Sequence, residues 1–71
     1  MSIQITLNGK KEALDKDLSI SELLALKNIR PEVVTVELND QIIPRDKFSG
    51  ISLKASDRIE FVYFMGGGYA V

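Results

Sequence analysis

Three consecutive glycines, Gly66, Gly67 and Gly68, are the residues whose type and spacing are most suggestive of chemistry. Glycine has no side chain to pack and loses more backbone freedom on ordering than any other residue, so the run predicts a mobile tail. A glycine thread that leaves a strand is narrow enough to enter the active site of another protein. We therefore expect a folded domain over residues 1–65 and a flexible functional tail over residues 66–71.

The residue types that are missing exclude most enzymatic chemistry. The 71 residues contain no histidine and no cysteine, which removes Ser-His-Asp and Cys-His nucleophiles and nearly every zinc or iron–sulfur site. The ten acidic residues are scattered, and the glycine run is not followed by the Lys-Ser/Thr of a phosphate-binding loop. The sequence therefore predicts a protein that is not itself an enzyme, with no metal site and no cofactor.

Charge and length limit the partners. Nine basic and ten acidic residues are interspersed along the chain and give a net charge of -1. No basic field therefore exists to follow a phosphate backbone, and nucleic acid is not expected as a partner. The charge-free stretch from Phe61 to Val71 is too short to cross a bilayer. The first residues lack the pattern of a secretion signal, which predicts no membrane partner and a cytoplasmic location.

The first elements to position the tail are a hairpin and a helix. Residues 2–7 alternate between polar and apolar, and Asn8-Gly9 favours a type I′ turn into a second strand over residues 10–14. Ser19 and Glu22 have the spacing of a capping box, so a helix is expected over residues 19–27, with Asn28 as a left-handed end. Its apolar face is predicted to comprise Ile20, Leu23, Leu24, Leu26 and the aliphatic stem of Lys27.

The second half of the chain predicts three more strands. Residues 33–38 are β-branched and alternating, Asn39-Asp40 turns them toward a short strand at residues 42–43, and residues 58–64 alternate as a last strand. Between these, residues 46–50 are predicted to form an irregular or single-turn segment with Phe48 as a buried anchor, and residues 53–57 to form a polar turn. In the last strand Ile59, Phe61 and Tyr63 are expected to point inward.

The element order β-β-α-β-β-β can bury its apolar faces only if the helix lies across one face of a mixed sheet. This arrangement is the ubiquitin-like β-grasp fold of the α+β class, with about five strands and the first and last strands adjacent in the middle. The predicted core comprises Ile3, Ile5, Leu7, Leu23, Leu24, Val36, Leu38, Ile59 and Phe61. Val62 and Phe64 would then be exposed beside the tail, and we interpret them, with Met65 and Gly66, as a partner-binding surface.

These residues resemble the ThiS-type sulfur carriers of thiamine biosynthesis and, in the same β-grasp family, MoaD. The resemblance rests on Asn39-Asp40-Gln41-Ile42-Ile43-Pro44-Arg45, on Asp57-Arg58-Ile59-Glu60 and on the glycine run, and it covers residues 1 to 68. Two positions depart from the family pattern. Ser56 stands where the family has a turn glycine, and Tyr69-Ala70-Val71 follow the glycine at which the family normally ends.

The resemblance implies a mechanism that needs neither histidine nor cysteine in the carrier. A C-terminal glycine carboxylate is a poor electrophile until ATP converts it to an acyl-adenylate, after which sulfur displaces AMP and leaves a thiocarboxylate. Gly68, with Gly67 before it, would be the reactive end once residues 69–71 are removed. The implied partners are an E1-like adenylating enzyme, a sulfur-donating cysteine desulfurase, thiazole synthase or another sulfur acceptor, and a processing peptidase.

Other functions would use the same residues differently. A carrier for cysteine, homocysteine or molybdopterin synthesis would pass its sulfur to a different acceptor, and the Tyr69-Ala70-Val71 extension favours a pathway that includes a peptidase. A ubiquitin-like modifier would pass its carboxyl group to a lysine amine, and a plain β-grasp binding module would not be activated at all. The mass of the mature protein distinguishes these alternatives.

Overall fold

The protein opens with a β-hairpin in its computed structural model, which describes residues 2–63. Strand β1 (Ile3–Leu7) pairs antiparallel with β2 (Lys10–Leu14). Asn8 and Gly9 connect them with φ angles of 51° and 84°, and a type I′ turn requires positive φ at both positions. The hairpin predicted from Asn8-Gly9 is confirmed.

Helix α1 (Ile20–Leu26) begins at the predicted capping box. The Glu22 amide donates to Ser19 Oγ at 3.1 Å, and the Ser19 amide donates to Glu22 Oε1 at 2.9 Å. Asn28, with φ of 60°, follows the helix in the left-handed conformation.

The apolar face of α1 is narrower than predicted. Ile20, Leu23 and Leu24 are buried, but Leu26 is 63% exposed. At 100° per residue Leu26 falls outside the stripe formed by the other three, and a single helix on a sheet buries only one such stripe. Lys27 lies on the predicted side of the helix: its side chain is 33% exposed, and its ammonium group pairs with the Glu12 carboxylate of β2.

Three further strands and two single-turn helices complete the chain. In order they are η1 (Pro31–Val33), β3 (Val34–Leu38), β4 (Gln41–Ile43), η2 (Arg45–Lys47) and β5 (Arg58–Tyr63). Val33, expected to begin β3, belongs instead to η1, because Pro31 favours the first position of a helical turn. Asn39 and Asp40 have φ angles of 51° and 71° and form a second tight turn.

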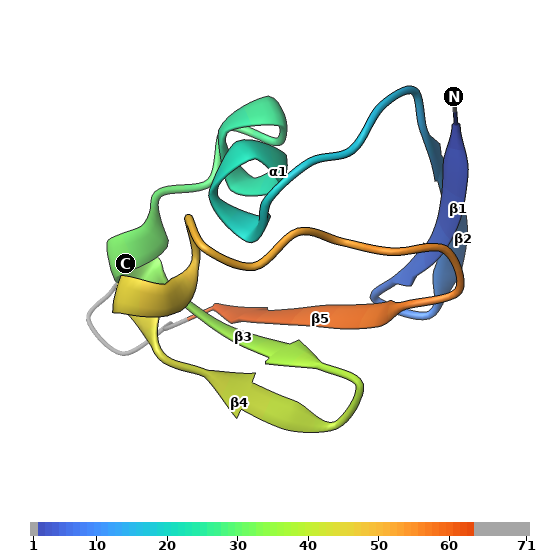
Figure 1. Cartoon of the computed structure of the whole chain (residues 1–71). Coiled ribbons are helices and arrows are strands. Elements are labelled where there is room, and N and C mark those ends of the chain that lie inside the picture. The colour runs from blue at the N-terminus through green and yellow to red at the C-terminus, as the bar shows by residue number, and fades with distance from the viewer. Residues whose placement is uncertain (1, 64–71) are drawn as a thin grey trace.

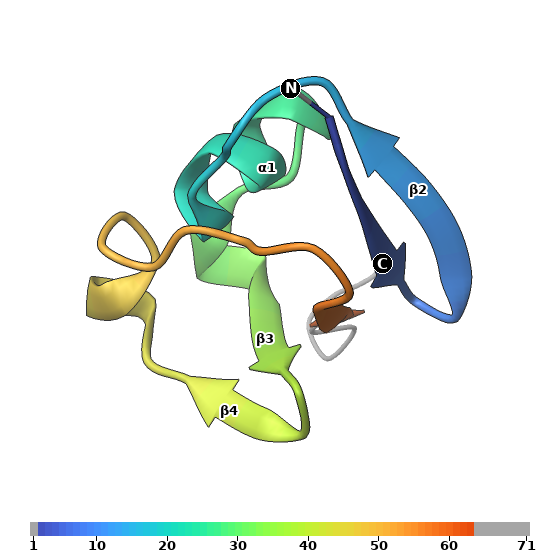
Figure 2. The same cartoon turned by 45° about the vertical axis from the view of Figure 1, so that its right-hand side comes forward.

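The strands form one sheet in the order β2-β1-β5-β3-β4. β1 and β5 are parallel, with Thr6 opposite Arg58, and all other pairs are antiparallel. Helix α1 and the long segment between η2 and β5 lie on the same side of this twisted sheet (Figures 1 and 2). The predicted β-grasp fold is confirmed, including the central position of the first and last strands.

The core lies between α1 and the covered face of the sheet. Of the predicted core residues, Ile3, Leu7 and Leu38 are only partly buried and line its edge, and the others are buried. Leu53, assigned to a polar turn, is 2% exposed, and its amide donates to the Leu18 carbonyl at 2.8 Å. The segment before β5 therefore contributes to the core, as does the predicted anchor Phe48. None of the helices in residues 2–63 has the length and apolar character to span a membrane.

Candidate functional site

Strand β5 is the element from which the predicted functional tail continues. Ile59 and Phe61 are buried at 0% and 6% exposure, whereas Val62 is 50% exposed, as strand alternation predicts. Tyr63 was expected to point inward and is 45% exposed instead. It is the last residue of β5, opposite Val34 at the first position of β3, so it lies at the margin of the core.

The face of the sheet opposite α1 carries an uncovered group of side chains near the end of β5. Strand pairing places Thr35 opposite Val62, Glu37 opposite Glu60, and Ile42 opposite Glu37. Residues directly opposite one another share a face, so these five side chains are neighbours across β4, β3 and β5. We call them the outer face: Thr35, Glu37, Ile42, Glu60 and Val62.

The outer face is apolar at two corners and acidic between them. Ile42 is 68% and Val62 50% exposed, while Glu60 is exposed and Glu37 partly buried. A hollow of about 280 Å³ adjoins the outer face at the end nearest Tyr63, and its lining includes Val34, Thr35, Ile42 and Arg45. An apolar and acidic surface with a hollow beside it can receive protruding side chains of a protein partner.

Two asparagines fix β5 in place beside this surface. Asn8 Oδ1 accepts a hydrogen bond of 2.8 Å from the Phe61 amide, across 53 residues of sequence. Asn39 Oδ1 accepts from the Arg58 amide at 2.9 Å, and Asn39 Nδ2 donates to Asp57 Oδ1 at 3.0 Å. The sequence indicated only turns at these asparagines; the side-chain bonds depend on the sheet and leave no local pattern.

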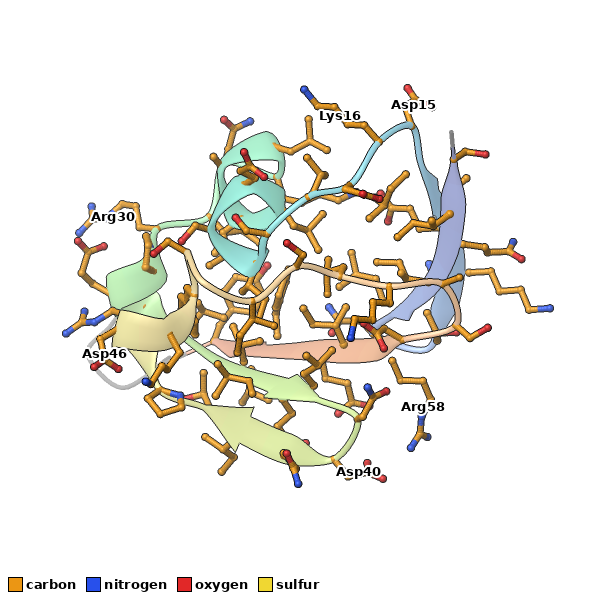
Figure 3. The ribbon with its side chains drawn as sticks, viewed as in Figure 1. Asp15, Lys16, Arg30, Asp40, Asp46 and Arg58 are labelled. Carbon is orange, nitrogen blue, oxygen red and sulfur yellow. The ribbon has the colours of Figure 1, made fainter. Side chains whose placement is uncertain are left out.

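An ion pair lies at the start of β5. Arg58 Nη2 donates to Asp40 Oδ2 at 2.8 Å, and Figure 3 shows both side chains projecting at the β3–β4 turn. Within residues 2–63 no three acidic side chains gather in a way that could hold a metal ion. The hydrogen bonds and the ion pair therefore hold the start and the middle of β5, the strand from which the tail continues.

Ser56, which stands where the resemblance implies a turn glycine, adopts a left-handed backbone conformation. Its φ is 72°, and its amide donates to the Gln4 carbonyl at 2.8 Å. Serine tolerates this left-handed conformation less well than glycine does. The backbone at Ser56 is therefore under local strain.

The remaining predicted site residues, Phe64, Met65, Gly66, Gly67 and Gly68, lie outside the described residues. Their roles stay predictions. The structure does place Val62, which was predicted with them, on an exposed surface next to Tyr63.

The family model, a curated relative and a solved structure all match this chain to the same family. The family model described as "ThiS family" matches residues 3–68. The sulfur carrier protein ThiS of Bacillus subtilis is 38% identical over 65 residues, which cover 90% of this chain and 98% of that protein. A crystal structure of the thiamine biosynthesis protein ThiS of Geobacter metallireducens superimposes with a TM-score of 0.79 at 45% identity, over 93% of this chain and all of that one.

A second kind of relative is much longer. The thiazole synthase of Magnetococcus marinus is 33% identical over 66 residues, which cover 93% of this chain but 20% of that protein. A region similar to this chain therefore forms about one fifth of that synthase.

Proposed function

The chain belongs to the ThiS family, and on that premise we propose that it is a sulfur carrier of thiamine biosynthesis that bears a thiocarboxylate on Gly68. The observation that carries the proposal is the junction between β5 and the glycine run. β5 lies in the middle of the sheet and leads, through Phe64 and Met65, into Gly66, Gly67 and Gly68. The family match ends at Gly68, which supports this residue as the reactive one.

The length of the tail limits where an activating enzyme can bind. Gly68 follows Tyr63 by five residues, which span at most about 17 Å when fully extended. The active site of an enzyme that holds Gly68 must therefore lie within about 17 Å of Tyr63, close to the surface around Val62. We propose Val62, with Phe64, Met65 and Gly66, as part of the surface that binds an E1-like adenylating enzyme.

The chemistry requires only the terminal carboxylate of the carrier. One oxygen of the Gly68 carboxylate attacks the α-phosphorus of ATP, pyrophosphate leaves, and an acyl-adenylate forms. A persulfide, formed from cysteine by a cysteine desulfurase, then attacks the acyl carbon and AMP leaves. A thiol reductant cleaves the resulting acyl disulfide and releases the thiocarboxylate. The carrier is a co-substrate in these steps, and its glycines avoid the Cβ atoms that would obstruct a narrow channel. Because adenylation consumes ATP, the proposal places the carrier in the cytoplasm.

Gly68 needs a free carboxylate, and at least Tyr69, Ala70 and Val71 follow it in this chain. We therefore propose that a peptidase cleaves the Gly68–Tyr69 bond before activation. An aromatic residue and a β-branched residue do not fit a channel shaped for glycine.

The acceptor that the comparisons favour is thiazole synthase. A region similar to this chain is covalently part of the Magnetococcus marinus enzyme, an arrangement that keeps a sulfur donor next to its acceptor at high effective concentration. This relationship favours thiamine synthesis over cysteine, homocysteine or molybdopterin synthesis as the destination of the sulfur.

Two forms of the chain test the proposal, one ending at Gly68 and one ending at Val71. Each is incubated with ATP, the adenylating enzyme of the same organism, a cysteine desulfurase, cysteine and a thiol reductant, and its intact mass is measured. The shorter form should gain the mass difference of oxygen replaced by sulfur, and the longer form should keep its mass. A Gly68→Val variant of the shorter form is the matched control and should not be converted.

Transfer to the acceptor is measured separately. The thiocarboxylated form should lose its sulfur to thiazole synthase in the presence of the other thiazole precursors. Equal conversion of the two lengths would refute the peptidase step. No conversion of either form, by an adenylating enzyme that converts another ThiS protein in the same assay, would refute the carrier function and leave a β-grasp binding module.

A further inference from the structure

The outer face has a feature that folding does not explain. Glu37 and Glu60 lie directly opposite each other on neighbouring antiparallel strands. Like charges in this position destabilise a sheet, whereas an opposite pair or a neutral pair would not. The arrangement costs stability, which indicates that the two carboxylates are placed to bind a group outside the domain.

No cation from residues 2–63 neutralises this pair. The three ion pairs of the described residues involve other carboxylates, those of Glu12, Glu32 and Asp40. Arg58 precedes Glu60 by two positions and so shares its side of β5, but its guanidinium is bonded to Asp40 at 2.8 Å. On the far side of Glu37 the opposing residue is the apolar Ile42.

The surroundings of the Glu37–Glu60 pair favour a protein as partner over a nucleic acid or an anionic membrane. Ile42 and Val62 are 68% and 50% exposed on the same face, so a partner that covers the carboxylates also buries apolar area. A nucleic acid or an anionic membrane would be repelled by two adjacent carboxylates. No helix or loop of the described chain covers this side of β3 and β5 (Figures 1 and 2).

We propose that an arginine or lysine side chain of the adenylating enzyme binds between the carboxylates of Glu37 and Glu60. The inference rests on the proposed function and adds the chemistry of the docking contact. Val62 and Ile42 contact apolar side chains on either side of that cation, which excludes water and strengthens the charge pairing. The location is continuous with the tail, because Val62 is separated from Gly68 by only six positions.

The proposed contact predicts that the stability of the carrier and its affinity for the enzyme change in opposite directions when a carboxylate is removed. Removing one carboxylate relieves the repulsion in the free carrier and should make it more stable. The same change removes a partner of the enzyme's cation and should weaken binding. A residue with a purely structural role would lower stability and binding together when it is changed.

The test uses the Gly68-ended chain with Glu37→Gln, Glu60→Gln and both changes combined. Glutamine preserves the shape of the side chain and removes the charge. We expect the double variant to melt about 2–4 °C higher by circular dichroism. Its Kd for the adenylating enzyme, measured by calorimetry, should rise at least tenfold, with a weaker dependence of Kd on salt concentration.

The matched control is Asp15→Asn combined with Asp17→Asn, which makes the same change in net charge. Both residues are exposed and lie on the loop between β2 and α1, and Figure 3 shows Asp15 on the opposite side of the molecule from β3 and β4. This control should bind the enzyme like the unmodified chain. Glu37→Lys should raise the melting temperature and bind more weakly than Glu37→Gln.

The outcomes separate this inference from the proposed function. If the unmodified chain is thiocarboxylated and the double variant binds the enzyme with unchanged Kd, the docking contact is wrong and the carrier function stands. If the double variant loses affinity for thiazole synthase and keeps its affinity for the adenylating enzyme, the contact is also wrong as proposed. If the unmodified chain is never activated, the carrier function itself fails.

Discussion

The two faces of the sheet use the same alternating strands for opposite purposes. The covered face presents side chains such as Ile59 and Phe61, which are almost entirely buried under α1 and the segment before β5. The outer face presents Glu37 and Glu60 opposite each other, with Val62 beside them. Every strand residue that packs the core therefore fixes the position of its neighbour on the other face. In these strands, a residue that stabilises the core and a residue available for binding a partner are therefore next to each other in the sequence.

The largest effect is expected on the covered face. Leu24 lies on α1 and is 1% exposed. Leu24→Ala should lower the free energy of unfolding by about 2–5 kcal/mol. Leu26→Ala on the same helix is the matched control, because Leu26 is 63% exposed, and it should cost less than about 0.5 kcal/mol. Chemical denaturation measures both. Equal costs would contradict the assignment of the buried stripe.

The next largest effect is expected at Asn39, whose side chain holds the start of β5 against the turn between β3 and β4. Asn39→Ala removes two side-chain hydrogen bonds, to Asp57 and to the Arg58 amide, and puts alanine at a φ of 51°. We expect a loss of about 2 kcal/mol by urea denaturation. Arg58→Gln is the control and should cost less than about 0.5 kcal/mol, because its ion pair with Asp40 is exposed. If Arg58→Gln lowers the free energy of unfolding more than Asn39→Ala does, the turn is stabilised mainly by the ion pair and the prediction is wrong.

A smaller gain is expected at Ser56. Ser56→Gly should stabilise the domain by about 0.5–1 kcal/mol, because glycine adopts the φ of 72° without strain. The melting temperature should rise by about 4 °C. Ser56→Ala retains the Cβ and should give no such gain. If alanine stabilises as much as glycine, backbone strain is not the cause.

The smallest effect on stability is expected on the outer face. Val62→Ser should change the unfolding free energy by less than about 0.5 kcal/mol, because the side chain is half exposed. Phe64→Ser should likewise leave the melting temperature nearly unchanged and weaken binding of the adenylating enzyme. Lys11→Gln, an exposed residue of β2, is the binding control. Unfolding of either serine variant would show that the residue belongs to the core.

The sequence predicted the regular elements well because their signals are local. Asn8-Gly9 specifies a turn, Ser19 and Glu22 specify a helix start, and two-residue alternation distinguishes Phe61 from Val62. The burial of Leu53 could not be predicted in this way, because the segment before β5 has no period and its burial depends on where the sheet places it. The pairing of Glu37 with Glu60 has the same origin, since it joins strands that are far apart in the chain.

The pairing of β1 with β5 has a consequence for how the protein is made. These two strands come from opposite ends of the described chain, and Thr6 pairs with Arg58. Contacts between distant residues form slowly, because the intervening loop must close first. During synthesis the middle of the sheet stays open until β5 has left the ribosome. The glycine run is translated after β5, so a chain interrupted before residue 58 lacks both its central strand and the reactive end. An activating enzyme therefore meets that end only on a chain that can fold.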